Sequence, residues 1–584
     1  MNLNIKKIVL FCLCFLFLDA CCADPELRRV ASGSESLQTV KPPVPRKAAP
    51  ADPSAYHHFL LSQMKLKEGK IDEAIEELRL AISFDRKEPF LHVELATDLY
   101  IHKKLLNEAV EECKTALKHH PDYLPAHLLL GQIYYHLKNN PLAIESYKRA
   151  IEIDPNYRDS YLFLSSLYAY MQEYDKAIQT LEQFLKVEPA SLMAFYSLGT
   201  IYREMKSYEK AAEYFSKALS LEPNQPSILL DLAMTYELQN ETDKAMETYQ
   251  RVLAIDSDNK RARNRLAQIL IRKKKLDEAL DQFREIQKED SGDLDIRTKI
   301  GLIYLEQGKL DEAIVEFNFV LAANPKDDRV RYYLAAAYVE KGSLDPAVSE
   351  FKKILPESEF FADSRRSIVL IFRKQKKMEE ILQILEESIK AKPNDVDLYI
   401  ILSGHYEKEN QPENALAILK RGLERNKDNP ELLFQLGAIY DKLGDFDKTI
   451  AHMEEVLRIN PNHADALNYL GYSYAERGTH LEEALKLIEK AMALKPNMGY
   501  ITDSLGWVYF KLGLYEKAVT ELEKANQLTP DDPTITEHLG DSYAKLSQTE
   551  KARELYEKAL KLEPKPDQIE RLNNKIKELN EKKK

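Results

Sequence analysis

The sequence is poor in cysteine and tryptophan and has no excess of positive charge. One tryptophan and five cysteines occur in 584 residues, and four of the cysteines lie within the first 22 positions. A disulfide framework is therefore excluded for the body of the chain. Lysine and arginine number 83 against 95 acidic residues, and this net charge of −12 argues against non-specific binding of nucleic acid. With 44% hydrophobic and 30% charged residues, the composition is that of a globular protein.

Long apolar runs are also scarce. The run at the amino terminus, Ile8 to Leu18, is 11 residues long and follows Lys6 and Lys7. That length is too short to cross a bilayer and is typical of the core of a signal peptide. We therefore predict that residues 1–20 are a signal peptide and that the protein is exported.

The end of this segment, Leu18-Asp19-Ala20-Cys21, resembles a bacterial lipobox. The resemblance implies that Cys21 becomes the lipidated first residue of the mature chain, which would anchor the protein to a membrane. By similarity to enterobacterial sorting, Cys22 in the next position implies the outer membrane, with the body facing the periplasm. Asp19 departs from the pattern, and the alternative is ordinary cleavage near Ala23, which would give a soluble periplasmic or secreted protein.

Residues 21–54 are rich in proline and poor in apolar side chains. The prolines are Pro25, Pro42, Pro43, Pro45, Pro50 and Pro53. A flexible chain of about 30 residues has a root-mean-square reach of about 30 Å, and proline extends it further. This segment is predicted to be a tether that keeps the body near the membrane.

The body of the chain repeats with a period of 34 residues. One position of the repeat is alanine in 13 of 15 copies. The copies are Ala74, Ala109, Ala143, Ala177, Ala211, Ala245, Ala279, Ala313, Ala347, Ile381, Ala415, Thr449, Ala484, Ala518 and Ala552. Two of the steps, those that end at Ala109 and Ala484, are 35 residues long. Small residues recur twelve positions before this track in most repeats, and prolines recur twelve positions after it.

Apolar residues three and four positions apart surround each small residue, as Phe195 and Tyr202 surround Gly199. This is the helical period. A turn and a second amphipathic helix follow, and a proline ends that helix. A 34-residue helix–turn–helix of this kind is identified as a tetratricopeptide repeat. The predicted fold is all-α, a right-handed α-solenoid of about 15 such repeats.

The repeats are not uniform. Pro356 interrupts the ninth repeat, and Val369 stands where the tenth needs a small residue. We expect a kink or hinge within 343–393, the alternative being an imperfect but regular repeat. The predicted divisions are 55–359 for repeats 1–9, 360–566 for repeats 10–15, and 567–584 for a capping helix and basic tail. The cap is expected to turn four apolar residues inward: Ile569, Leu572, Ile576 and Leu579.

Catalytic motifs are lacking. The sequence contains no HExxH, no GxSxG and no P-loop pattern. Cys113 lies near His119, which can suggest a metal site, but it also lies four residues after Ala109, where a small buried hydrophobe packs. We predict no metal, no cofactor and no enzymatic activity.

The family resemblance implies where a partner binds. In tetratricopeptide repeats, positions 2, 5, 9, 12 and 13 of the repeat point into a groove lined by the first helices. In the first repeats these positions include Tyr56, Phe59, Phe90, Tyr100, Tyr135, Tyr170, Met193, Tyr196 and Met234. A second aromatic group comes from the last repeats: Tyr472, Tyr500, Trp507 and Phe510. An apolar lining favours a partner site, with packing against neighbouring repeats or against the tether as the alternative.

Two stretches between these groups, 259–276 and 365–377, carry many basic residues and no acid. The residues expected to face the groove are Arg261, Arg272, Arg366, Arg373 and Lys374. They can hold an acidic segment, a carboxyl terminus or an anionic polymer. The alternative is that these charges are simply solvated.

The closing repeats read LNYLGYSYAERG at 467–478, DSLGWVYF at 503–510 and EHLGDSYAK at 537–545. They resemble the end of large tetratricopeptide lipoproteins of Gram-negative bacteria, the LbcA-like adaptors. This resemblance implies a non-catalytic adaptor that binds a periplasmic carboxyl-terminal processing protease and presents substrates to it. The alternative is a scaffold of an envelope assembly, such as one for polysaccharide export.

Overall fold

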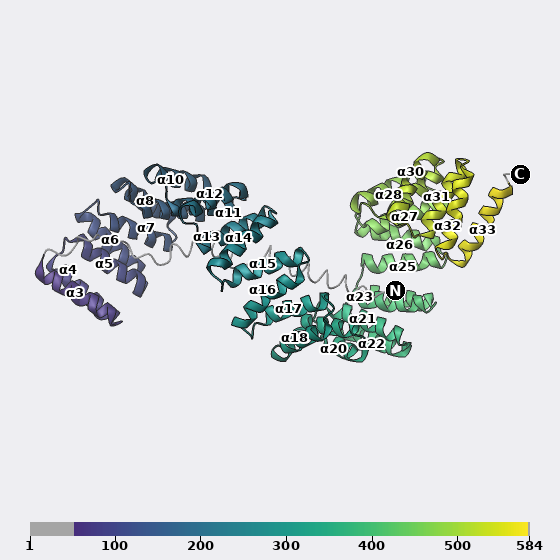
Figure 1. The fold of residues 1–584 in the computed structure, drawn as a ribbon, viewed down its shortest axis with the longest axis horizontal. Helices are drawn as coiled ribbons and strands as arrows, with labels where there is room; N and C mark the ends of the chain where they lie inside the picture. Colours follow the sequence, from purple (N-terminus) through teal and green to yellow (C-terminus); the bar gives the residue numbers. More distant parts are fainter. Residues whose placement is uncertain (1–51, 582–584) are drawn as a thin grey trace. The chain divides into compact units, whose positions relative to one another are not determined.

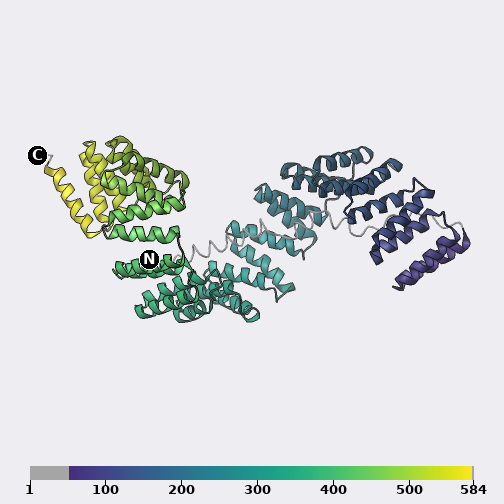
Figure 2. The same cartoon turned by 180° about the vertical axis from the view of Figure 1, so that it is seen from behind.

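The computed structural model describes residues 52–581, and these form helices and turns without a β-strand. Figures 1 and 2 show the helices following one another as antiparallel pairs along the chain. The all-α solenoid predicted from the 34-residue period is confirmed. The predicted signal peptide, Cys21 and most of the tether lie outside the described residues.

Each repeat contributes a first and a second helix. The first helices are α3 (Pro53–Lys67), α5 (Pro89–Asp98), α7 (Leu124–His136), α9 (Arg158–Tyr170), α11 (Leu192–Glu204), α13 (Pro226–Leu238), α15 (Lys260–Arg272), α17 (Leu294–Glu306), α19 (Asp328–Glu340), α21 (Phe361–Lys374), α23 (Val396–Lys408), α25 (Pro430–Lys442), α27 (Ala464–Arg477), α29 (Gly499–Lys511) and α31 (Pro533–Lys545). The second helices are α4 (Ile71–Phe84), α6 (Leu106–His119), α8 (Asn140–Ile153), α10 (Tyr174–Val187), α12 (Tyr208–Leu221), α14 (Thr242–Ile255), α16 (Leu276–Glu289), α18 (Leu310–Ala323), α20 (Leu344–Lys353), α22 (Met378–Ala391), α24 (Pro412–Arg425), α26 (Phe446–Ile459), α28 (Leu481–Leu494), α30 (Tyr515–Leu528) and α32 (Thr549–Lys561), and α33 (Pro566–Glu581) follows them.

The described residues form two compact units, which meet between Val320 and Leu321. The boundary expected between residues 359 and 360 falls inside the second unit. There α20 ends early, at Lys353, and the chain runs through a turn to Phe361. Arg365 is buried against this turn and donates hydrogen bonds to the carbonyl oxygens of Phe351 and Ile354, at 2.7 and 3.3 Å. A buried side chain therefore holds the turn between α20 and α21 in place, and we call this turn the joint.

The small-residue track lets the two helices of a repeat approach closely. A Cβ added to Gly199 would lie 2.7 Å from the ring of Phe215, which is fully buried. In the third repeat a Cβ at Gly131 would collide with the ring of Tyr147. The large side chain of the second helix thus fills the space above the small residue of the first, and this contact is repeated along the core.

Replacing Gly199 by valine is expected to lower the free energy of unfolding of its repeat by about 1–3 kcal/mol, because the new side chain overpacks Phe215. Alanine at the same position should cost less, since Ala233 and Ala267 occupy it in other repeats. Gly404, whose added Cβ would meet nothing within 4 Å, is the matched control. Chemical denaturation followed by circular dichroism measures the difference, and equal losses for the two valine variants would contradict this packing.

The two 35-residue steps are absorbed in different ways. In the second repeat the extra residue forms a π-helical turn at Leu99–Lys103, which ends at Lys104 with a φ of 57°. In the thirteenth it lengthens the turn between α27 and α28, where Gly478 and His480 both have positive φ. The first helix of the second repeat is therefore reshaped at its end, while the repeats on either side keep their register.

The capping helix α33 is present, but its register differs from the prediction. Leu572 is fully buried, and Ile576 and Leu579 pack against the last repeat. Ile569, expected to face inward, is 41% exposed, and Gln568 is buried in its place, donating a hydrogen bond to Glu537 at 2.8 Å. The apolar pattern alone missed this because polar bonds to Glu537 set the rotation of the helix.

Candidate binding surfaces on the first helices

First helices of neighbouring repeats touch one another within each unit. In the first unit α5 contacts α7 and α9 contacts α11, and in the second unit α27 contacts α29 and α29 contacts α31. The first-helix side is therefore the inner side of the stack. All candidate residues predicted for partner binding lie on first helices or, for Tyr100, on the π-helical turn that continues one.

The predicted apolar and aromatic groove residues differ in how far their side chains are exposed. Exposed members are Tyr56, Tyr170, Met193 and Tyr500, at 42%, 49%, 42% and 42%. Half-buried members are Phe59, Tyr100, Tyr135, Tyr196, Tyr472 and Phe510. Phe90, Met234 and Trp507 are buried, at 3%, 6% and 7% exposed. For these three, burial favours the alternative of packing against neighbouring side chains, as Phe59 packs against Phe90 with ring centroids 5.0 Å apart.

Four rings of the first unit form a continuous row, which we call the tyrosine ladder: Tyr100, His136, Tyr135 and Tyr170. The ring centroids of Tyr100 and His136 are 5.5 Å apart, and those of Tyr135 lie 5.4 Å from both His136 and Tyr170. The rings come from three consecutive repeats and lie at or near the carboxyl ends of their first helices. Tilted and edge-to-face contacts of this kind are favourable for aromatic pairs.

A buried polar network continues this surface in α11 and α13. Asp231 is 8% exposed and accepts hydrogen bonds from the hydroxyl of Tyr196 at 2.7 Å and from Nη1 of Arg203 at 2.5 Å. The hydroxyl of Tyr196 is therefore held by an adjacent repeat. Asp231 and Arg203 therefore fix this part of the surface. Met193 is the exposed apolar side chain beside Tyr196.

The second unit carries an aromatic and ionic cluster on α27, α29 and α31. Trp507 lies between the rings of Phe510 and His538, at centroid distances of 4.7 and 4.0 Å, and its Nε1 donates to Glu476 at 2.6 Å. His538 is bonded to Asp503 at 2.9 Å. Burial alone would lower the pKa of His538, but the charge of Asp503 and its hydrogen bond outweigh burial and raise it. The imidazole stacks on Trp507, and its protonated form would be in a favourable cation–π arrangement there.

Two of the five predicted basic residues pair with an acid, and a third lies beside a histidine. Arg272 bonds Glu237 at 3.3 Å, and Arg373 lies 3.5 Å from His405. Arg366 bonds Asp363 at 2.5 Å. Neutralisation of this kind favours the alternative that the basic stretches are solvated helix faces.

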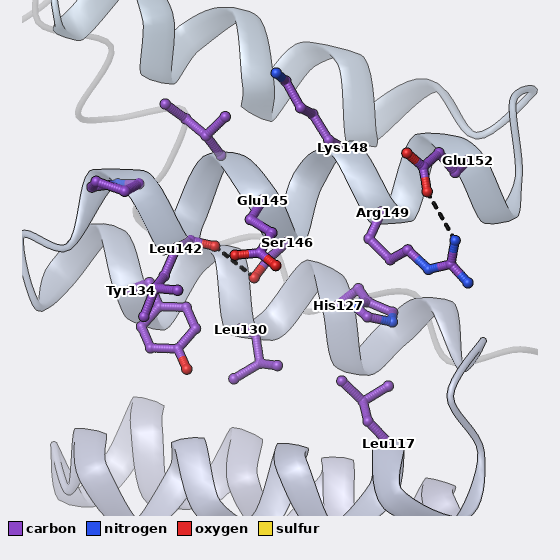
Figure 3. A pocket seen from close by; sticks show the side chains of 12 residues that line it. Leu117, His127, Leu130, Tyr134, Leu142, Glu145, Ser146, Lys148, Arg149 and Glu152 are labelled. Atoms are coloured by element: carbon purple, nitrogen blue, oxygen red, sulfur yellow. Dashed lines mark hydrogen bonds and ion pairs between the residues drawn. The ribbon is translucent and has the colours of Figure 1, made fainter.

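A cavity of about 620 Å³ opens among α6, α7 and α8, and no sequence motif indicated it. Figure 3 shows Leu130 and Tyr134 of α7 beside it, with Lys148 and Arg149 of α8 at its rim. Arg149 is held by an ion pair with Glu152 at 2.8 Å. Apolar side chains and side chains of both charges line this cavity, so the lining does not favour one class of ligand.

The described residues contain no group of three side chains able to hold a metal ion. Cys113 is fully buried, and burial raises the pKa of its thiol well above the ordinary value, so it is the packing residue that the sequence predicted. Across residues 52–581 no helix has the length and apolar character that a membrane span needs.

Comparison with protein families covers most of the body. Tetratricopeptide repeat models match residues 58–88, 238–301, 304–361 and 369–570. A model described as the cytochrome c-type biogenesis protein H TPR domain matches residues 113–229. The chain is a tetratricopeptide repeat protein. Among curated proteins, none matches this tetratricopeptide repeat chain.

Several solved tetratricopeptide repeat structures are similar to parts of the chain. MamA from Desulfovibrio magneticus is 28% identical, over 29% of this chain and 94% of its own, with a TM-score of 0.26. A tetratricopeptide repeat protein from Parabacteroides merdae is 18% identical, over 43% of this chain and 99% of its own, with a TM-score of 0.32. YrrB, titled a TPR protein with an unusual peptide-binding site, is 22% identical over 34% of this chain and all of its own, with a TM-score of 0.29. With every TM-score below 0.5, these structures add nothing further about this chain.

Proposed function

We propose that this protein is a non-catalytic scaffold that binds partner proteins or peptides on the inner, first-helix surface of its repeats. The observation that carries the proposal is the exposure of Tyr170 and Met193 on that surface, next to the half-buried Tyr135 and Tyr196. Exposed aromatic and methionine side chains on a rigid helical wall are typical binding anchors. Tetratricopeptide repeats in general bind proteins or peptides.

The location we propose is the bacterial envelope. The support is the amino-terminal sequence: a short apolar run after two lysines, a segment resembling a lipobox at Cys21, and a proline-rich tether. In that setting the protein acts as an adaptor for a periplasmic carboxyl-terminal processing protease and its substrates. Tethering raises the effective concentration of bound partners, so that weak contacts suffice.

Affinity purification of the full chain from envelope extract, with mass spectrometry, tests this role. Recovery of a processing protease together with its substrates supports the adaptor. Recovery of a polysaccharide export complex without any protease contradicts the adaptor and supports an assembly scaffold.

Globomycin should make the precursor accumulate if Cys21 is lipidated, and unaffected processing would contradict the lipid anchor.

Changing Tyr170 and Met193 together to serine is expected to reduce partner capture at least 10-fold, because both are exposed apolar anchors of the first-helix surface. The fold should be unaffected, since neither side chain is buried. The matched control is Val315→Ser, which removes an apolar side chain that is 65% exposed on the second helix α18. Equal capture by the two variants, measured by quantitative pull-down, would place the binding surface elsewhere.

A further inference from the structure

Helix α3 is the first helix that the structure describes, and one of its faces is apolar and open. Figure 1 shows α3 and α4, in purple, at one end of the first unit. Tyr56, Leu60 and Met64 follow one another at intervals of four residues and are 42%, 43% and 57% exposed. Residues with this spacing form one ridge along a helix. We call these three residues the α3 stripe.

The corresponding face is buried in the rest of the array. Met64 lies ten positions before the alanine track, and the residue at this position is buried in every later repeat. Equivalent residues that are at most 4% exposed include Ile133, Leu167, Ile201, Ile269 and Ile303. The preceding repeat covers them, since Ile133, for example, belongs to one core cluster with Leu95 and Leu99 of the second repeat. Among the described residues no repeat takes this place beside α3, so its stripe is an uncovered end surface.

The opposite end of the array is covered. Leu572 of α33 is fully buried against the last repeat, whereas Glu570, Asn573 and Lys577 on the same helix are exposed. Polar end caps of this kind keep repeat arrays soluble. Because the outer face of α33 is mainly polar, a head-to-tail contact between two molecules would leave the α3 stripe without an apolar surface to pack on.

The α3 stripe is complementary to itself. In an antiparallel pair of α3 helices with a two-fold axis at Leu60, that leucine lies against its own copy. Tyr56 then lies against Met64 of the second molecule, because each is four residues from Leu60. Methionine packs favourably on aromatic rings. A two-fold contact uses the same patch on both molecules, so both stripes are covered at once.

Charge favours the same pairing. Asp52 is the N-cap of α3, and the last turn of the helix carries Lys65 and Lys67. Lys65 pairs with Glu73 at 2.6 Å, whereas Lys67 is exposed and has no acidic partner among the described residues. Asp52 and Lys67 are eight and seven residues from the centre of the stripe. The antiparallel pairing therefore brings Lys67 of each molecule near Asp52 of the other, and it also places opposite ends of the two helix dipoles together.

We propose that the α3 stripe binds a second copy of this chain, whose own α3 packs against it antiparallel across a two-fold axis. A stable interface buries about 800 Å² of each partner. Three apolar side chains and their polar rim supply less, so the dimer is weak and dissociates at roughly 10–100 μM. The pairing goes beyond the proposed function, because a dimer carries two copies of the first-helix surface and binds a partner with repeated motifs more tightly.

A photo-crosslinking amino acid in place of His57 tests the pairing in the purified full chain. His57 is exposed, and Gln63 of the second molecule would lie opposite it. In an equal mixture of unlabelled and ¹⁵N-labelled protein, we expect crosslinks that join residues 52–67 of a labelled and an unlabelled molecule, in a yield that rises with concentration. Leu60→Glu should reduce the yield at least 10-fold, because it brings two carboxylates together on the axis. Lys67→Glu should reduce it about 3-fold.

Leu80→Glu is the matched control. Leu80 is 45% exposed on α4 of the same repeat. Later repeats have exposed residues such as Arg149 and Arg251 at the equivalent position, so neighbouring repeats do not cover this surface. The control should leave the crosslink yield unchanged. Circular dichroism shows whether Leu60→Glu remains folded, and Met64→Glu, at the most exposed position of the stripe, is the second variant with the same expected loss.

Three results would overturn the pairing. The first is a yield that neither Leu60→Glu nor Met64→Glu changes. The second is crosslinks within single molecules only, which would show that another segment of the same chain covers the stripe. The third is no crosslink between copies at concentrations up to roughly 200 μM. Because no partner protein is present, failure of the pairing would leave partner capture by Tyr170 and Met193 in place, and failure of the proposed function would leave these crosslinks in place.

Discussion

Replacing Arg365 by methionine is expected to loosen the joint between α20 and α21 and to lower the free energy of unfolding by about 3 kcal/mol. Arg365 is 6% exposed, and burial lowers the pKa of its guanidinium to about 10, so it is still charged at neutral pH. Besides the carbonyls of Phe351 and Ile354, it donates to the hydroxyl of Ser388 at 3.1 Å. Its guanidinium also lies 4.2 Å from the ring centroid of Phe361.

The physical reason is that methionine removes the donor to the buried carbonyl of Ile354 and leaves that of Phe351 with only the backbone N–H of Ile354, at 3.3 Å. Each unsatisfied buried group costs about 1–3 kcal/mol. A positive charge at the carboxyl end of the shortened α20 is also favourable to the helix dipole. Lysine at the same position can satisfy one acceptor and should show a smaller loss.

Hydrogen exchange of residues 344–361 measures this effect locally, which suits an array whose repeats need not unfold together. Arg366→Met is the control, since that neighbour is exposed and pairs only on the surface. Unchanged protection of this segment in Arg365→Met would show that the joint does not depend on the buried arginine.

Glu537→Gln is expected to release the capping helix. The carboxylate of Glu537 is almost fully buried and accepts hydrogen bonds from Arg571 at 2.7 and 3.0 Å and from Lys575 at 2.7 Å. Burial alone would raise the pKa of Glu537, but these bonds outweigh it and lower the pKa to about 2. The amide of glutamine cannot accept from two cations with the same strength. We expect protection of residues 566–581 from hydrogen exchange to fall about 100-fold, equivalent to roughly 3 kcal/mol.

The same carboxylate gives the cap a pH dependence of known sign. A folded-state pKa of about 2 lies below the ordinary value of 4.5, so the stabilisation is fully present above pH 4.5 and is lost as the pH falls from there towards 2. In Glu537→Gln this dependence should disappear. Glu570→Gln, which changes an exposed carboxylate of α33, is the control. A cap that opens at the same pH in all three proteins would contradict the assignment to Glu537.

The sequence predicted the repeat well because the period, the small residues and the prolines are local and recur. It could not predict which first-helix residues are open. Trp507 is covered by His538, 31 residues later, and bonds Glu476, 31 residues earlier. The side chains that cover Trp507 come from other repeats, so the pattern within one repeat does not predict its burial. Ile569 faces outward for a related reason, since Glu537 of the preceding repeat sets the rotation of α33.

Arg365 was not identified from sequence because its role depends on where α20 ends. The 34-residue pattern predicts a second helix of ordinary length, and Pro356 indicated only that it is interrupted. The carbonyl oxygens of Phe351 and Ile354 at the end of this shortened helix then accept hydrogen bonds from a neighbouring arginine. The tyrosine ladder was partly predictable, since Tyr100, Tyr135 and Tyr170 were chosen by position, whereas their mutual contacts were not.

The most direct test of the account places a photo-crosslinking amino acid at Met193 in cells and compares it with the same residue at Val315. Both sites are exposed, the first on the inner surface of α11 and the second on α18. If the first helices are the binding surface, a distinct partner protein is attached at position 193 and none at position 315. Partner adducts at position 315 with none at position 193 would contradict the claim that the first helices are the binding surface.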